Sequence, residues 1–334
     1  MDRREFLKRS SVLLARLALT PIPHIAIYPT TPPPASLGRI TTWRRQGVYV
    51  KPRLDAERVA WHVHDEIIPL YAAVKGDAPW PSNAIWYETD GGFIHSAFVQ
   101  PVEDRPQREV VTRVASPGFW AEVSVPIAEA RWQANGASVA RRLYYGSVYR
   151  VVAAEEDETG QWWYRIQEGY SFIPSLYLPA WSLRRFPPGE LLPISPDRDD
   201  KRIEIRLSTQ TLTCFEGKEP VFETRISSGI SGLVTPRGEY RVIWKRHTHR
   251  MIGGTGEDYY DLPGVAFPTY LTPSGVAIHG TYWHNDFGQP HSHGCVNVTN
   301  EAARWIFRWT TPVVPYRDHF LRSNGDDGTP IAVL

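Results

Sequence analysis

The sequence is poor in cysteine and in net charge, and it has no long uninterrupted apolar run. Two cysteines among 334 residues, Cys214 and Cys295, allow at most one disulfide and exclude a disulfide-framed scaffold. Lys and Arg total 37 and Asp and Glu total 36, so no bulk field favours nucleic acid or an anionic membrane as a partner. Hydrophobic residues (42%) and charged residues (22%) are near globular averages, which excludes wholesale disorder.

Aromatic residues and proline are abundant. The chain contains 13 Trp, 16 Tyr and 29 Pro. Aromatic side chains favour strands and proline interrupts helices, so the composition predicts a mainly β protein with short strands and turns. The length fits two or three domains.

The N-terminus resembles a twin-arginine export signal, with Arg3-Arg4 followed by Phe6-Leu7-Lys8. The apolar stretch at 12–19 contains Arg16 and is shorter than the roughly 18 residues of a membrane span, so we expect no stable span. A basic, frayed N-terminus is the alternative. Residues 29–34 predict a polyproline spacer. We therefore assign residues 1–37 to signal and spacer, and expect an extracytoplasmic protein of the cell envelope.

Two stretches of the chain resemble each other. Trp86-Tyr87 and Trp163-Tyr164 lie 77 positions apart, as do Gly92 and Gly169. Each of the two stretches fits a strand, a Gly turn and a second strand. The pattern resembles the bacterial SH3-like barrels that often accompany wall-active enzymes. It implies two small β-barrels, at 38–105 and 106–190, that either bind the wall or brace the enzyme.

A third region is expected at 200–318, with a C-terminal tail at 319–334. Ile203 and Ile205 alternate with polar residues, as in a half-buried strand. Thr299 is a candidate cap for a helix, and Ala302, Ile306 and Trp309 follow helical spacing. The region is thus predicted to be β-rich with one or two short helices. The basic run at 245–250 is interpreted as a solvated loop.

One segment of this region concentrates reactive side chains. Four of the eleven His and one of the two Cys fall within seventeen positions, namely His279, His284, His291, His293 and Cys295. A cysteine becomes a competent nucleophile when a nearby His or local dipole favours the thiolate. His279 follows an apolar strand, and Gly294 permits a sharp turn that can aim backbone N–H groups at a developing oxyanion. The segment is therefore a candidate site for cysteine-dependent acyl transfer.

The joined motif, His279-Gly280 followed by Ser292-His293-Gly294-Cys295-Val296-Asn297, resembles the L,D-transpeptidase (YkuD-like) catalytic domain. The resemblance implies Cys295 as nucleophile, His279 as general base and the Gly280 carbonyl as the group that orients it. Ser292, His293 and Gly294 would line the nucleophile turn, with the N–H groups of Gly294 and Cys295 as oxyanion donors. Asn297 occupies a position where many members have Arg. Substrate contacts are expected from Asn297, Tyr282, Trp283 and His284.

The resemblance further implies peptidoglycan stem peptides as the partners and 3→3 cross-links as the product. The terminal D-alanine of the donor would be released as a cysteinyl thioester forms, and the reaction would need no metal or cofactor. If water intercepts the thioester, the same site acts as an L,D-carboxypeptidase.

Two other interpretations remain open. The clustered His and Cys side chains could be zinc ligands, although their spacing matches no common zinc pattern. Alternatively, the protein binds the wall through its paired modules and its catalytic domain is vestigial.

Overall fold

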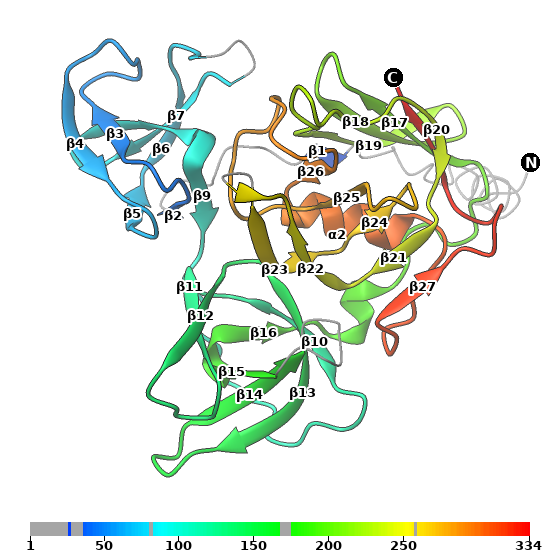
Figure 1. The fold of residues 1–334 in the computed structure, drawn as a ribbon, viewed down its shortest axis with the longest axis horizontal. Helices are drawn as coiled ribbons and strands as arrows, with labels where there is room; N and C mark the ends of the chain where they lie inside the picture. Colours follow the sequence, from blue (N-terminus) through cyan, green and yellow to red (C-terminus); the bar gives the residue numbers. More distant parts are fainter. Residues whose placement is uncertain (1–25, 28–35, 80–82, 168–174, 257–258) are drawn as a thin grey trace, which may run out of the picture.

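The computed structural model describes residues 26–27, 36–79, 83–167, 175–256 and 259–334. Three β-rich regions follow one another along the chain (Figure 1): a first region in blue and cyan, a second in green, and a C-terminal domain in yellow, orange and red with further green strands. The prediction of a mainly β protein is confirmed. No helix in the described ranges is long and apolar enough to cross a membrane.

The first region consists of two small sheets around a core that includes Ile40, Val48, Tyr87 and Ile94, all fully buried. The predicted hairpin is present, because β7 (Ile85–Thr89) and β8 (Gly92–His95) pair antiparallel across Gly91 and Gly92. That these sheets form an SH3-like barrel stays a prediction. The three-stranded sheet has the order β5 (Ile67–Leu70), β2 (Ser36–Ile40) and β9 (Val99–Val102); the five-stranded sheet has the order β4 (Arg58–His62), β3 (Gln46–Tyr49), β8 (Gly92–His95), β7 (Ile85–Thr89) and β6 (Ala72–Lys75).

The second region is one seven-stranded sheet, which packs its own cluster of buried side chains. Its strands β14 (Trp162–Gln167) and β15 (Leu176–Pro179) pair antiparallel, as the repeat predicted, but the predicted turn at 169–173 lies outside the described residues. The order is β12 (Val139–Tyr144), β11 (Ile127–Arg131), β15 (Leu176–Pro179), β14 (Trp162–Gln167), β13 (Val148–Glu156), β10 (Phe119–Val123) and β16 (Leu183–Arg185).

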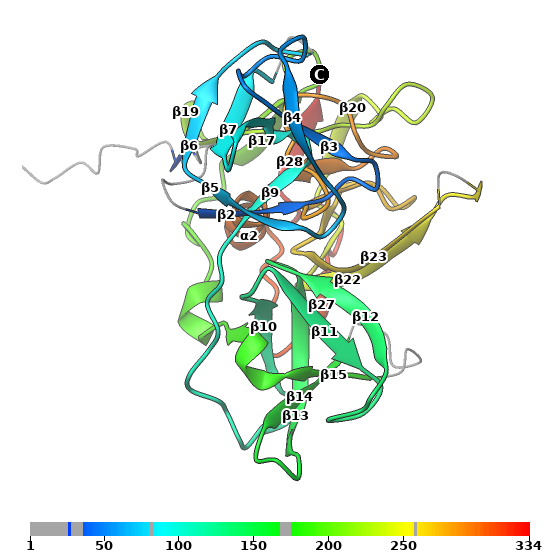
Figure 2. The ribbon, with the colours of Figure 1, turned by 90° about the vertical axis from the view of Figure 1, so that its left-hand side faces the viewer.

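The C-terminal domain contains three sheets, and its core, which also includes Trp120, Val148 and Phe186 of the second region, is the largest hydrophobic cluster of the described residues. One sheet has the order β1 (Ala26–Ile27), β19 (Glu219–Arg225), β18 (Thr211–Glu216), β17 (Lys201–Arg206), β28 (Pro330–Val333) and β20 (Gly238–Arg241). A second has the order β26 (Val296–Val298), β25 (Ala277–Gly280), β24 (Thr269–Tyr270), β21 (Trp244–Arg246) and β27 (Phe320–Arg322). The third is a hairpin of β22 (Thr248–Gly253) and β23 (Tyr260–Ala266), which projects from the domain in Figure 2.

Strand pairing extends beyond two of the predicted boundaries. Residues 319–334 are not a tail, because β27 pairs with β21, and β28 lies between β17 and β20 in the large sheet. Their non-local pairing leaves no periodic signature in so short a stretch. Ala26–Ile27, inside the predicted signal and spacer, pair parallel with Phe222–Glu223 of β19.

The helix α2 (Asn300–Trp309) packs against β25. The side chain of Thr299 accepts the N–H of Ala302, and Ala302, Ile306 and Trp309 are buried, so the predicted cap and apolar face are confirmed. Three further short segments are 3₁₀ turns: η2 (Ser96–Phe98), η3 (Ala180–Ser182) and η4 (Pro188–Leu191).

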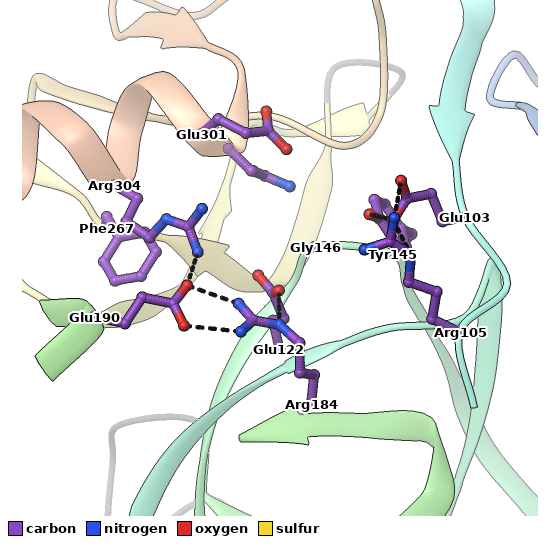
Figure 3. Close-up of a pocket in the computed structure, with 11 residues that line it drawn as sticks. Glu103, Arg105, Glu122, Tyr145, Gly146, Arg184, Glu190, Phe267, Glu301 and Arg304 are labelled. Carbon is purple, nitrogen blue, oxygen red and sulfur yellow. Dashed lines mark hydrogen bonds and ion pairs between the residues drawn. The ribbon is translucent and has the colours of Figure 1, made fainter. Parts of the chain in front are cut away.

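Ion pairs join the second region to the C-terminal domain (Figure 3). Arg184 of β16 donates to Glu122 (2.6 Å) and to both carboxylate oxygens of Glu190 (2.8 and 2.9 Å). Arg304 of α2 also pairs with Glu190. These side chains lie around a cavity of about 390 Å³ together with Glu301. The network therefore fixes α2, and with it the back of β25, to the second region.

Candidate active site

His279 and Cys295 lie on neighbouring parallel strands or directly beside them. The β25–β26 register places His279 opposite Asn297, and Cys295 immediately precedes β26. Side chains two residues apart on an extended strand share one face, so Cys295 and Asn297 lie on the same face as His279. All three line one cavity of about 650 Å³.

The protonation state of His279 follows from its surroundings. Its Nδ1 donates to the carbonyl oxygen of Gly280 at 3.0 Å, which leaves Nε2 with the lone pair. The side chain is 2% exposed, and burial lowers the pKa of His279 to about 4. At neutral pH the imidazole is therefore uncharged and available as a base.

Cys295 follows a turn that its neighbours hold closed. The Oγ of Ser292 donates to the carbonyl of Cys295 (2.5 Å) and accepts the N–H of Gly294 (3.1 Å), while Thr235 Oγ1 donates to the carbonyl of Gly294 (2.9 Å). Gly294 has φ +121°, a conformation that favours glycine. In this structure the N–H of Gly294 is thus already bonded, and it would reach an oxyanion only after leaving Ser292.

The thiol of Cys295 is not an ion in this environment. Burial raises the pKa of Cys295, and its Sγ lies 3.7 Å from the carbonyl oxygen of Gly275. The cavity thus holds an uncharged thiol and an uncharged imidazole rather than a preformed ion pair.

Asn297 presents its amide to the cavity and is anchored from behind by His284. Its side-chain nitrogen position lies 2.9 Å from Nε2 of His284, while Nδ1 of His284 accepts the N–H of Asp286 at 3.2 Å. Burial lowers the pKa of His284 well below its ordinary value, so the ring carries one proton, on Nε2. That N–H needs an acceptor, which assigns the amide oxygen to the His284 side and the NH₂ group to the cavity. Asn297 thereby supplies a hydrogen-bond donor close to Cys295.

Comparison with protein families agrees with this geometry. Residues 200–333 match the family model described as the L,D-transpeptidase catalytic domain. These residues form an L,D-transpeptidase catalytic domain.

Solved L,D-transpeptidases are among the similar structures. A mutant of the Enterococcus faecium enzyme is 25% identical, with 42% of this chain and 51% of that chain covered and a TM-score of 0.33. The Mycobacterium smegmatis enzyme is 18% identical (49% and 75% covered, TM-score 0.34), and that of Stackebrandtia nassauensis is 19% identical (44% and 63% covered, TM-score 0.30). The chain spans about half the length of the Enterococcus faecium protein. No curated protein matches the chain.

The other side chains predicted to touch substrate divide into two groups. Trp283 lines the cavity of the L,D-transpeptidase domain, as do Ser292 and His293 at the nucleophile turn. Tyr282 does not, because its hydroxyl is buried and donates to the carbonyl of Pro263 (2.8 Å). His284 is also absent from the cavity lining, and it acts behind Asn297. Neither residue lines the cavity, so substrate contact by Tyr282 and His284 stays a prediction.

Several side chains of the cavity were missed from the sequence. The hairpin β22–β23 contributes Met251, Tyr260 and Leu262, and the first region contributes residues 41–44 and Phe98. Only contacts across the fold place them there, so no local pattern marks them. Within the described ranges, no group of three or more His, Cys, Asp or Glu side chains is placed to hold a metal ion.

Proposed function

We propose that the protein is an exported cysteine-dependent L,D-transpeptidase that forms 3→3 cross-links between peptidoglycan stems. The observation that carries the proposal is the shared cavity of Cys295 and His279, on one face of two parallel strands, with Nδ1 of His279 fixed by Gly280. A base held in one tautomer beside a thiol is what acyl transfer through a thioester requires.

In the first half-reaction, Nε2 of His279 takes the thiol proton as Sγ of Cys295 attacks the carbonyl carbon of the third stem residue. A C–S bond forms and the negative charge develops on the carbonyl oxygen. Asn297 lines this cavity and is a candidate side-chain donor to that charge. Collapse of the intermediate breaks the C–N bond, and His279 returns the proton to the amine of the departing D-alanine.

In the second half-reaction, an amine of a neighbouring stem attacks the thioester. A C–N bond forms, the C–S bond breaks, and the amine proton passes through His279 to the thiolate. If water replaces the amine, the product is a tripeptide and the enzyme trims rather than cross-links. Both half-reactions pass through an oxyanion, so one set of donors serves both.

Purified protein and a Cys295→Ala variant incubated with disaccharide-tetrapeptides test the proposal. Mass spectrometry of the wild-type reaction should show dimers that lack one D-alanine, with or without monomeric tripeptides, and Cys295→Ala should give neither. The matched control is Cys214→Ala, because Cys214 is fully buried in β18 and away from the cavity. If Cys295→Ala retains turnover, or if the wild type leaves the tetrapeptide intact, the proposal is wrong.

Export by the twin-arginine route belongs to the same proposal. Arg3-Arg4 and the short apolar stretch support the export signal, and a wall substrate requires an extracytoplasmic enzyme. Replacing Arg3-Arg4 by Lys-Lys should leave the protein in the cytoplasm of a twin-arginine-competent bacterium. Secretion of that variant at the wild-type level would refute the route.

A further inference from the structure

The first region forms one wall of the catalytic cavity. Thr41, Thr42, Trp43 and Arg44 follow β2, and together with Phe98 of η2 they line the same space as His279 and Cys295. In Figure 2 the strand β2 passes alongside the C-terminal domain. About 240 residues of chain separate this wall from the catalytic strands, so it is built only when the two regions dock.

The docking is specific. Buried Arg39 donates through Nη2 to the carbonyl of Tyr282 at 2.7 Å, and the N–H of Asn285 donates to the carbonyl of Ala97 at 2.7 Å. These contacts hold the first region against the loop that follows β25. Two further bonds act between the same surfaces: Asn83 Nδ2 to Asp286 Oδ1 (2.8 Å) and Asn285 Nδ2 to the hydroxyl of Tyr87 (2.8 Å). Residues 41–44 are thus held at the cavity by a buried, hydrogen-bonded interface.

The charge of the cavity is uneven. No Asp or Glu is among its described lining residues, and Arg44 is their only Lys or Arg. Arg44 makes no ion pair within the described ranges; only its backbone N–H is bonded, to Thr42 Oγ1. Asp286 is buried and pairs with the lining residue His291 at 2.6 Å. An exposed guanidinium in a cavity without carboxylates is complementary to an anionic ligand.

Trp43 offers an aromatic surface beside this guanidinium. Its ring stacks on His64 with centroids 3.7 Å apart and an interplanar angle of 20°, yet the residue is 86% exposed. One face of the indole is therefore supported while most of the side chain remains open to solvent. A large ring held in this way is ready to cover the apolar part of a ligand.

We propose that Trp43 and Arg44 form a substrate subsite contributed by the first region, in which Arg44 pairs with a free carboxylate of the stem peptide and Trp43 covers the adjacent apolar surface. The inference rests on the proposed function and adds a role to it: the first region selects anionic peptides for the transpeptidase domain.

Binding rather than turnover tests this subsite. In the full-length Cys295→Ala background, the affinity for a stem tetrapeptide is measured by calorimetry for Arg44→Ala and for Arg45→Ala. Arg45 is the matched control, since it is equally basic and exposed but does not line the cavity. A charge-assisted hydrogen bond at a partly exposed site predicts that Arg44→Ala weakens binding about tenfold. Arg45→Ala should change it by less than about twofold.

Two further arms make the result specific. For a tetrapeptide whose carboxylates, including the C-terminal one, are all amidated, Arg44→Ala should have less than about a twofold effect, because the ion pair is already absent. Trp43→Ala should weaken binding about three- to tenfold, whereas Trp61→Ala, an exposed Trp of the same region outside the cavity, should not.

Equal effects of Arg44→Ala and Arg45→Ala, an undiminished loss with the amidated peptide, or no binding to the Cys295→Ala protein each overturn the subsite. Turnover by the protein with Cys295 intact is read separately. If that protein processes the tetrapeptide while Arg44→Ala binds it normally, the subsite is wrong and the proposed function stands. If binding depends on Arg44 but no turnover occurs, the proposed function is wrong and the subsite stands.

Discussion

Lowering the pH from about 7.5 to about 6.0 should leave kcat/KM for D-alanine release nearly unchanged, because His279 stays neutral over this interval. Burial lowers the pKa of His279 to about 4 from 6.5. That shift corresponds to roughly 3 kcal/mol in favour of the neutral ring. At pH about 6.0 such a ring is about 99% neutral, whereas an ordinary imidazole is only about one quarter neutral.

The two cases differ measurably. A base with an ordinary pKa would lose about fourfold in kcat/KM between these pH values, while His279 should lose only a few per cent. Stem carboxylates titrate below this window and stem amines above it, so the substrate does not obscure the result. Circular dichroism at each pH would show that the protein remains folded.

The thiol provides an independent reading. Because burial raises the pKa of Cys295, its alkylation by iodoacetamide should still be accelerating at pH about 9. An acid limb of kcat/KM centred near pH 6.5, or alkylation that is already maximal at neutral pH, would refute the neutral pair and favour a preformed thiolate–imidazolium pair.

Three other predictions follow from buried polar groups and close backbone contacts. Lys245→Met should lower the free energy of unfolding, measured in urea, by about 2–5 kcal/mol, because three carbonyl oxygens at 2.6–2.8 Å lose their donor. The control Lys218→Met, at an exposed position, should change the free energy of unfolding little. Equal losses in the two variants would contradict a stabilising role of the buried ammonium group. Gly280→Ala should lower kcat at least tenfold with a smaller effect on binding, since its Cβ would lie 2.2 Å from Asn300 Oδ1 and displace the carbonyl that holds the catalytic base; unchanged kcat would argue against that carbonyl's role. Burial lowers the pKa of His247 to about 3, so the unfolded chain binds more protons below pH about 6.5, and the melting temperature should fall as the pH drops from there towards 4. A melting temperature that is constant over that range would be inconsistent with a buried neutral ring.

Local patterns were sufficient for the centre of the site. His279-Gly280 ends one strand and Ser292 to Cys295 leads into the next, so a parallel pairing of those two strands brings the reactive side chains together. The helix cap at Thr299 was also predictable, because a cap and an apolar face need only a few consecutive residues.

The basic run at 245–250 shows that charge alone does not predict exposure. Its charge predicts a solvated loop, but Lys245 and His247 are fully buried. Burial lowers the pKa of Lys245, yet only an ammonium group has three N–H donors for its three carbonyl partners near the end of α2. Those acceptors belong to Phe307, Thr310 and Pro312, more than 60 positions away, and they supply the compensation that no sequence pattern revealed.

The same limit applies to the cavity wall and to the large sheet. Trp43 and Arg44 carry no motif, and their position depends on a buried contact between Arg39 and Tyr282 that spans 243 positions. Pro330–Val333 is too short to show alternation and pairs with a strand more than 120 positions earlier. Pairings of this kind arise from tertiary docking, which a window of neighbouring residues does not record.

The position of β28 has a consequence for biosynthesis. Because this strand fills the space between β17 and β20, the large sheet stays incomplete until Pro330–Val333 have emerged from the ribosome. A nascent chain that stops even a dozen residues earlier exposes two unpaired strand edges instead of a finished sheet. The large sheet therefore closes only once residues 330–333 are available to it, and a truncation before Pro330 would leave its interior open.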